Sequence, residues 1–253
     1  MDNKLKIWEL PDEKTILEAT KEITKYIRFL HPDIVKKIVD NNNENLNKWK
    51  KGLKSKGVDA DIYLWEDCAV CFPGVRRYKG SERSTSFRQK DIDTSSLNAI
   101  YIDDNDYPKH LWSYLFTNKP FRKQGPIGYT LAHLIDHNDF TINRRNHELE
   151  IESTLPFYGL FTSITNTVYL PNNLYKPTDF NKKVRLMIMN RAAYLYKDIC
   201  ALLPNGFTIP EIDVNDPWHI DNFEWADLYE GNLVNVDNFV KYRNEKMDEF
   251  LDR

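Results

Sequence analysis

The chain has 253 residues, of which 41% are hydrophobic and 13% aromatic. This composition excludes full disorder and the collagenous and low-complexity classes, because it supplies enough bulky apolar surface for a buried core. The formal net charge of -3 argues against a surface that binds any polyanion non-specifically. No stretch approaches the roughly 18 uninterrupted apolar residues of a membrane helix, and no signal-like apolar run follows the first residues. We therefore expect a cytoplasmic protein with no membrane partner.

Helical spacing marks the N-terminal part of the chain, residues 1–60. Apolar residues recur every three or four positions from Ile16 to Leu30, which is the spacing of one helix face. Thr15 and Glu18 fit a capping box at the start of this helix. The pattern predicts one helix that reaches Leu30.

Two further helices are predicted before residue 60. Pro32 suits the first turn of a short helix that carries the apolar residues of segment 34–39. A third helix, ending near Gly57, is marked by three apolar residues, Leu46, Trp49 and Leu53. These helices are interpreted as scaffold.

A β-rich centre, residues 61–180, follows. The helical spacing is lost from Ile62 to about Ile102, where short apolar runs between Pro and Gly indicate strands and loops. Residues 107–116 fit a helix or a strand equally well. The apolar run 129–135 predicts a buried strand, and segment 157–170 predicts a second one. Together they predict a hairpin with a long polar loop.

The C-terminal part, residues 181–253, again has helical spacing. Apolar positions from Val184 to Leu202 predict a long amphipathic helix ended by the turn at 204–206, and a final helix is expected from about Val236 to Leu251. Because the strands lie between helical ends, we expect an α+β fold in which helical parts surround a small central β core, all in one compact unit.

The histidines point to the hairpin as the candidate site. Three of the six, His133, His137 and His147, form the only cluster along the sequence, and it begins in the first predicted strand. A strand that delivers a His and an Asp to its polar end, followed by a strand with an Asn, places a general base beside donors for a divalent cation. The candidates are His133, Asp136, His137 and Asn166.

Two sequence runs carry a resemblance to a known family. The run from Gly128 to His137 (Gly-Tyr-Thr-Leu-Ala-His-Leu-Ile-Asp-His) and the run from Asn166 to Asn173 (Asn-Thr-Val-Tyr-Leu-Pro-Asn-Asn) resemble the HNH, or ββα-metal, nucleases. The resemblance covers residues 125–180, under a quarter of the chain. It implies a ββα-metal core with His133 as the base that deprotonates water and Asn166 as a brace. It also implies Asn173 as a ligand of a divalent cation.

Further implications of the resemblance concern the ion and the substrate. The cation would be Mg²⁺ or Mn²⁺, with Zn²⁺ less expected, and Asp136 or His137 would share it with Asn173. The substrate would be DNA, paired cuts in a duplex would imply a homodimer, and a restriction or defence role follows by analogy. Position 132 is Ala where many members have a metal-binding Asp or His. A shifted register, with Asp136 as ligand and His137 as base, therefore stays open.

A basic loop precedes the hairpin and supplies candidate DNA contacts. Its cationic residues could reach phosphates or a guanine edge, although a solvated loop explains them equally well. They are Arg76, Arg77, Lys79 and Arg83.

The cysteines suggest structure more than chemistry. Three cysteines cannot form a disulfide framework, so a reducing compartment is the simpler context. Cys68 and Cys71 form half of a four-ligand zinc site, and the chain contains no second pair. Two buried or half-buried thiols at a strand end are the favoured interpretation.

Two other functional classes remain open. His133 and His137 are four residues apart, so on a helix they would share one face, as in a zinc-dependent hydrolase with Asp136 as the acid. Alternatively, the histidine cluster is structural and the protein is a non-catalytic module that binds nucleic acid or protein.

Overall fold

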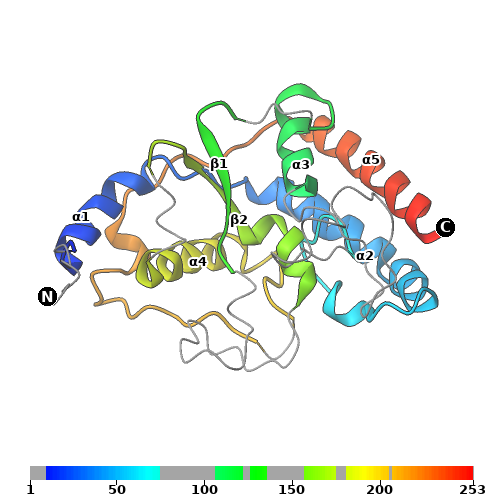
Figure 1. The fold of residues 1–253 in the computed structure, drawn as a ribbon, viewed down its shortest axis with the longest axis horizontal. Helices are drawn as coiled ribbons and strands as arrows, with labels where there is room; N and C mark the ends of the chain where they lie inside the picture. Colours follow the sequence, from blue (N-terminus) through cyan, green and yellow to red (C-terminus); the bar gives the residue numbers. More distant parts are fainter. Residues whose placement is uncertain are drawn as a thin grey trace, which may run out of the picture.

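The computed structural model describes residues 10–74, 106–121, 126–135, 157–174, 181–204 and 207–252. Within these ranges the chain forms five helices, α1 (Glu13–Thr24), α2 (Pro32–Ser55), α3 (Asp106–Thr117), α4 (Lys182–Tyr196) and α5 (Leu233–Asp252). The strands β1 (Tyr129–His133) and β2 (Thr167–Pro171) form one antiparallel sheet in the same ranges (Figure 1). The predicted α+β class is confirmed.

The first helix is shorter than its apolar spacing predicts. α1 ends at Thr24, and its N-cap is Asp12, whose side chain accepts a hydrogen bond from the backbone N–H of Thr15 (2.8 Å). The predicted capping role of Thr15 is therefore wrong, because Asp12 supplies the acceptor one turn earlier.

An extended segment replaces the predicted end of that helix. Arg28 exchanges two backbone hydrogen bonds with Tyr169 of β2 (3.0 and 3.2 Å), and the next residues pair with Tyr229. Ile27 and Leu30 are buried by this pairing, not by a helix face. Helical periodicity failed here because backbone partners from distant parts of the chain compete for the segment.

The two helices predicted after Pro32 are a single helix. α2 runs for 24 residues, with His31 as its N-cap and Pro32 in its first turn as predicted. It ends at Ser55, close to Gly57, whose positive φ of 75° favours glycine. The polar residues 40–45 between the two apolar groups continue the helix, and Asn42 among them is fully buried.

The predicted hairpin is confirmed, with a different approach to its second strand. β1 and β2 pair with His133 opposite Thr167 and Tyr129 opposite Pro171. The segment before β2, predicted as strand, instead forms two 3₁₀ helices, η3 (Tyr158–Thr162) and η4 (Ile164–Asn166). A Cβ on Gly159 would lie 2.4 Å from the carbonyl oxygen of Tyr63, so this turn packs directly against another backbone segment.

The remaining helices agree with the spacing in kind but not always in length. Residues 107–116, which fitted either element, belong to α3. α5 matches the predicted final helix. α4 ends at Tyr196 rather than Leu202, because Ala201 already donates its backbone N–H to the carbonyl oxygen of Asp67 (2.8 Å).

One cluster of buried apolar side chains connects these elements. It includes residues of α2, β2, α4 and α5, for example Ile38, Val168, Met187 and Phe239. In Figure 1 the hairpin crosses the middle of the molecule, with α4 beside its lower part and α3 and α5 to one side. Among the helices within the described ranges, none is both long and apolar enough to cross a membrane.

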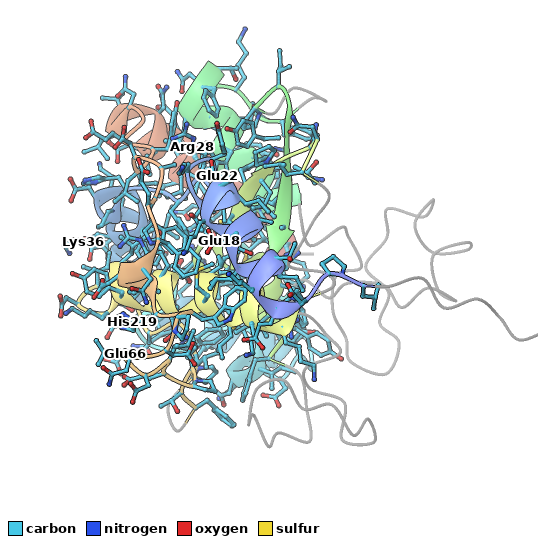
Figure 2. The ribbon with its side chains drawn as sticks, turned by 90° about the vertical axis from the view of Figure 1, so that its left-hand side faces the viewer. Glu18, Glu22, Arg28, Lys36, Glu66 and His219 are labelled. Atoms are coloured by element: carbon cyan, nitrogen blue, oxygen red, sulfur yellow. The ribbon has the colours of Figure 1, made fainter. Side chains whose placement is uncertain are left out.

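The outward side of α1 is charged but locally paired. Figure 2 shows Glu18 and Glu22 projecting from this helix. They form ion pairs three residues away with Lys21 (2.9 Å) and Lys25 (2.8 Å). Exposed pairs of this kind contribute little to stability because solvent screens them, so they support the helix rather than mark a site.

Candidate active site

His133 is the last residue of β1, where the strand turns away from β2. Its side chain is half-buried, and Nε2 of the ring lies 2.8 Å from the carbonyl oxygen of Phe161 in η3. A carbonyl oxygen can only accept a hydrogen bond, so the proton of the neutral ring is assigned to Nε2. The lone pair of the imidazole then resides on Nδ1.

The contact of His133 differs from those of the other histidines in the described ranges. His31, His110 and His219 each use Nδ1 to accept a backbone N–H, at 3.2, 2.7 and 3.4 Å. His31 and His219 are helix N-caps, and His110 receives the N–H of Phe121. Those three rings hold backbone turns through Nδ1, whereas the contact of His133 with the Phe161 carbonyl oxygen uses Nε2.

Asn166 ends η4 directly before β2 and is almost completely buried, with 4% exposure. Its side-chain oxygen accepts the backbone N–H of Ile135 (2.7 Å), and its amide donates to the carbonyl oxygens of Ile135 (3.1 Å) and Leu160 (3.0 Å). The backbone N–H of Leu134 also donates to the Asn166 carbonyl oxygen (2.9 Å). Both amide protons of this side chain are therefore used.

The side-chain amide of Asn166 connects the residues that follow His133 with the 3₁₀ helix that contacts its ring. Leu160 precedes Phe161, the residue whose carbonyl holds His133, and Ile135 lies two residues after His133. Asn166 consequently ties the chain that leaves β1 to the turn that orients the imidazole. This is the arrangement expected if the amide braces both the hairpin and the base.

Asn173 is not brought to this end of the hairpin. It is exposed in the turn after β2, next to Asn172, whose backbone N–H donates to the carbonyl oxygen of Gly128 (2.7 Å) at the start of β1. With a rise of about 3.4 Å per residue, the five-residue strand separates the two ends by about 14 Å. The structure thus places Asn173 away from His133 and Asn166.

Several predicted site residues lie outside the described ranges. These are the two candidate cation ligands directly after Ile135 and the cationic residues of the basic loop, namely Asp136, His137, Arg76, Arg77, Lys79 and Arg83. Their roles remain predictions. Among the residues that can be described, no group of three or more His, Cys, Asp or Glu side chains is arranged to hold a metal ion.

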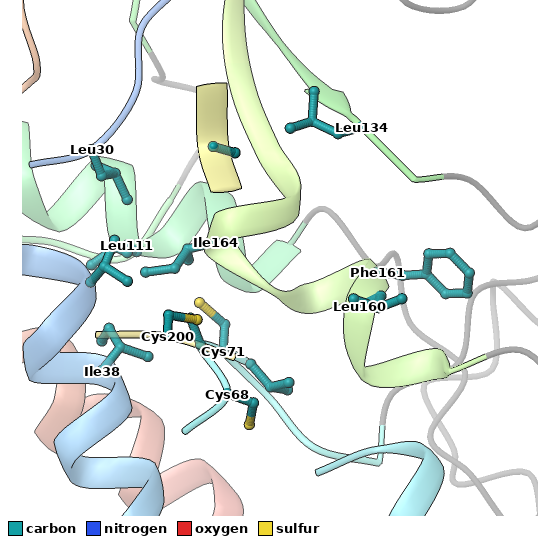
Figure 3. Close-up of a cluster of buried hydrophobic side chains, with 14 of the residues drawn as sticks. Leu30, Ile38, Cys68, Cys71, Leu111, Leu134, Leu160, Phe161, Ile164 and Cys200 are labelled. Atoms are coloured by element: carbon teal, nitrogen blue, oxygen red, sulfur yellow. The ribbon is translucent and has the colours of Figure 1, made fainter. Parts of the chain in front are cut away.

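The three cysteines are buried free thiols, as the favoured sequence reading predicts for Cys68 and Cys71. Burial raises the pKa of Cys71 to about 12, and it also raises the pKa of Cys200 to about 12. Figure 3 shows the three side chains within the apolar core, near Ile38 and Leu111, while the ring of Phe161 points away from them. They act as small apolar residues in the core.

Neither of two hollows formed by described residues contains the whole candidate site. A groove of about 510 Å³ lies between the C-terminal half of α4 and segment 201–212. Leu202 and Ile209 line both this groove and a small apolar pocket that reaches Ile135 and Asn166. His133 lines neither, so the placement of polar groups, not the shape of a cavity, singles out the candidate site.

One feature of the site was not visible in the sequence. The partner of His133 is a backbone carbonyl, which every residue has, so no residue type at position 161 could have announced it. Asn166, in contrast, could be identified from the sequence, because its role depends on its residue type. Comparisons of the chain with protein families, with curated proteins and with solved structures found no match.

Proposed function

We propose that the protein is a metal-dependent endonuclease of the HNH type, in which His133 activates the water that attacks a phosphodiester bond of DNA. The observation that carries the proposal is the 2.8 Å contact between Nε2 of His133 and the Phe161 carbonyl oxygen. In the neutral ring this contact assigns the proton to Nε2 and the lone pair to Nδ1, and the Asn166 hydrogen bonds fix the backbone on both sides of the contact. A general base must be oriented in this way before it can take a proton efficiently.

The reaction assigned to these residues is a hydrolysis. Nδ1 of His133 takes a proton from water as the water oxygen bonds to phosphorus, and the bond from phosphorus to the leaving sugar oxygen breaks. The Phe161 carbonyl steadies the imidazolium that forms, because the Nε2–H bond to it strengthens when the ring is charged. Asn166 keeps that carbonyl and the residues after β1 in register throughout.

A divalent cation, when bound, would stabilise the negative charge on the phosphorane and on the leaving oxygen. Asp136 and His137 are the residues proposed to hold it, because they follow Ile135, whose backbone N–H and C=O are both bonded to Asn166. A carboxylate and an imidazole are suitable donors for Mg²⁺ or Mn²⁺. Contacts to DNA from Arg76, Arg77, Lys79 and Arg83 remain part of the proposal.

The zinc-hydrolase reading gains no support from the hairpin. It requires His133 and His137 on one face of a helix, but residues 129–133 form a strand and residues 134 and 135 a bend. The non-catalytic module is therefore the alternative that an experiment must separate from the nuclease.

Incubation of the full chain with supercoiled plasmid tests the proposal. We expect nicked and linear products with Mg²⁺ or Mn²⁺ and none with EDTA, with Ni²⁺ and Zn²⁺ tested in parallel and single-stranded DNA as a second substrate. A binding module would instead retain DNA in a salt-sensitive manner without cleavage products under any metal, and that result would refute the enzyme.

A further inference from the structure

Arg243 on α5 is a fully buried cation. Burial lowers the pKa of its guanidinium to about 10, so the group is still charged at neutral pH. Within the described ranges no carboxylate forms an ion pair with it, and its Nε has no hydrogen-bond partner there. A buried charge that lacks a counter-ion is costly unless other groups stabilise it.

Neutral acceptors hold this guanidinium instead. Nη1 donates to the side-chain oxygen of Asn42 (3.0 Å) and to the carbonyl oxygen of Val70 (3.4 Å), and Nη2 donates to the side-chain oxygen of Asn41. The guanidinium carbon also lies 5.2 Å from the centre of the Trp49 ring, in a cation–π contact. Arg243 therefore joins α5 to α2 and to segment 68–72.

Asn42 of α2 forms hydrogen bonds with the same segment. Its amide donates to the carbonyl oxygens of Cys68 (2.8 Å) and Val70 (3.0 Å). Because Asn42 receives its own hydrogen bond from Arg243, the cation orients the amide and the amide fixes the segment. The buried side chains of Arg243 and Asn42 therefore hydrogen-bond to one edge of segment 68–72.

The opposite edge of this segment carries the turn that holds His133. Cys71 donates its backbone N–H to the carbonyl oxygen of Thr162 (3.0 Å), and Ile164 donates to that of Ala69 (3.1 Å). Between them, Val70 and Ser163 form a β-bridge. Thr162 is the neighbour of Phe161, whose carbonyl oxygen accepts from His133.

We infer that Arg243 is a positioning residue for His133: together with Asn42 it fixes segment 68–72, and this segment in turn fixes the turn that presents the Phe161 carbonyl to the imidazole. The inference deepens the proposed nuclease function and rests on it for its catalytic meaning. A purely structural role, in which Arg243 only joins α5 to α2, is the competing explanation.

Two variants and one control separate these explanations. Arg243→Met removes the donors while keeping a long apolar chain. Met247→Ala, at another fully buried position of α5, removes apolar side-chain atoms from the same helix and leaves the hydrogen-bond donors of Arg243 in place. The first readout is the ¹⁵N spectrum of the His133 ring in the full chain, assigned with His133→Gln and recorded without metal or DNA. The second is plasmid nicking at saturating and limiting DNA.

We expect wild type and Met247→Ala to show the Nε2–H form of His133. Arg243→Met should show a mixture of the two ring forms and a kcat lower by about tenfold or more, with KM within about twofold, because small misplacements of a base are costly. Arg243→Met spectra and kcat equal to those of Met247→Ala would overturn the inference. If Arg243→Met does not fold, Asn42→Ser is measured in the same way, and the same equality in that variant overturns it.

The spectrum distinguishes failure of this inference from failure of the nuclease. If wild type cuts no DNA under any metal, the proposed function is lost, but a change of the His133 ring in Arg243→Met would still establish the structural coupling. If wild type cuts DNA and the ring is unaffected by Arg243→Met, the function stands and the positioning role is lost.

Discussion

His133 and Asn166 are held by consecutive carbonyl groups of one 3₁₀ helix. Nε2 of His133 donates to the Phe161 carbonyl oxygen (2.8 Å), and the amide of Asn166 donates to the Leu160 carbonyl oxygen (3.0 Å). The same 3₁₀ helix therefore orients an imidazole at the end of β1 and an amide directly before β2. Its Phe161 carbonyl fixes which nitrogen of the ring carries the proton, and the position of this proton decides which nitrogen can act as a base.

Asn166→Ala should destabilise the protein by about 2–4 kcal/mol, because it leaves buried backbone groups of Ile135 and Leu160 without their partner. Urea unfolding monitored by tryptophan fluorescence measures the change. Asn190→Ala is a matched control, because Asn190 also donates to two carbonyl oxygens and accepts one backbone N–H, but its partners lie in α4 and in segment 210–212 rather than in η3.

The two variants should differ in activity more than in stability. We expect nicking to fall well below the wild-type rate in Asn166→Ala and to stay near it in Asn190→Ala, at a temperature where both are folded. Equal activities of the two folded variants would show that Asn166 does not help to position His133 and acts only as a buried structural residue.

The sequence was informative where a pattern depends on neighbouring residues. Apolar spacing predicted α5 and most of α2, and Pro32 correctly marked a helix start. Short apolar runs bounded by turns predicted the hairpin, although the first strand ends at His133, two residues before the end of its predicted run. Asn166 was identified because an Asn in the second predicted strand segment matches the brace position of the family that the two runs resemble.

The failures occurred where distant segments decide the outcome. The segment after α1 has helical spacing but pairs with Tyr169 and Tyr229, and the residues before β2 form 3₁₀ turns against segment 69–72. The buried contact between Arg243 and Asn42 joins residues about 200 positions apart, and a lone Arg on a C-terminal helix gives no sign of it. Tertiary contacts of this kind override local preference.

The stability of the protein should depend on pH through His110. Burial lowers the pKa of this ring to about 4, whereas an unfolded histidine titrates near 6.5. Between these values the unfolded chain binds the proton and the folded protein does not, so stability is full above about pH 6.5 and falls toward pH 4, by at most about 3 kcal/mol. His110→Asn should flatten the dependence of the unfolding free energy on pH in this window. An unchanged slope would show that another group causes it.

The exposed position of Asn173 leads to a prediction about the cation. Because Asn173 lies at the end of the hairpin opposite His133, Asn173→Ala should leave the Mn²⁺ concentration for half-maximal nicking unchanged within about twofold. A tenfold or larger increase in that concentration would instead restore Asn173 as a ligand and require a rearranged turn after β2.

The most direct test of the central claim is single-turnover nicking of plasmid DNA by His133→Ala beside His219→Ala, with the folding of both checked by circular dichroism. His219 caps η6 (Ile220–Asn222) by accepting the backbone N–H of Asp221 at Nδ1, so its loss should affect stability slightly and cleavage little. We predict that His133→Ala lowers the cleavage rate by about 10²-fold or more, with His219→Ala near wild type. Cleavage by folded His133→Ala at the wild-type rate would contradict the account.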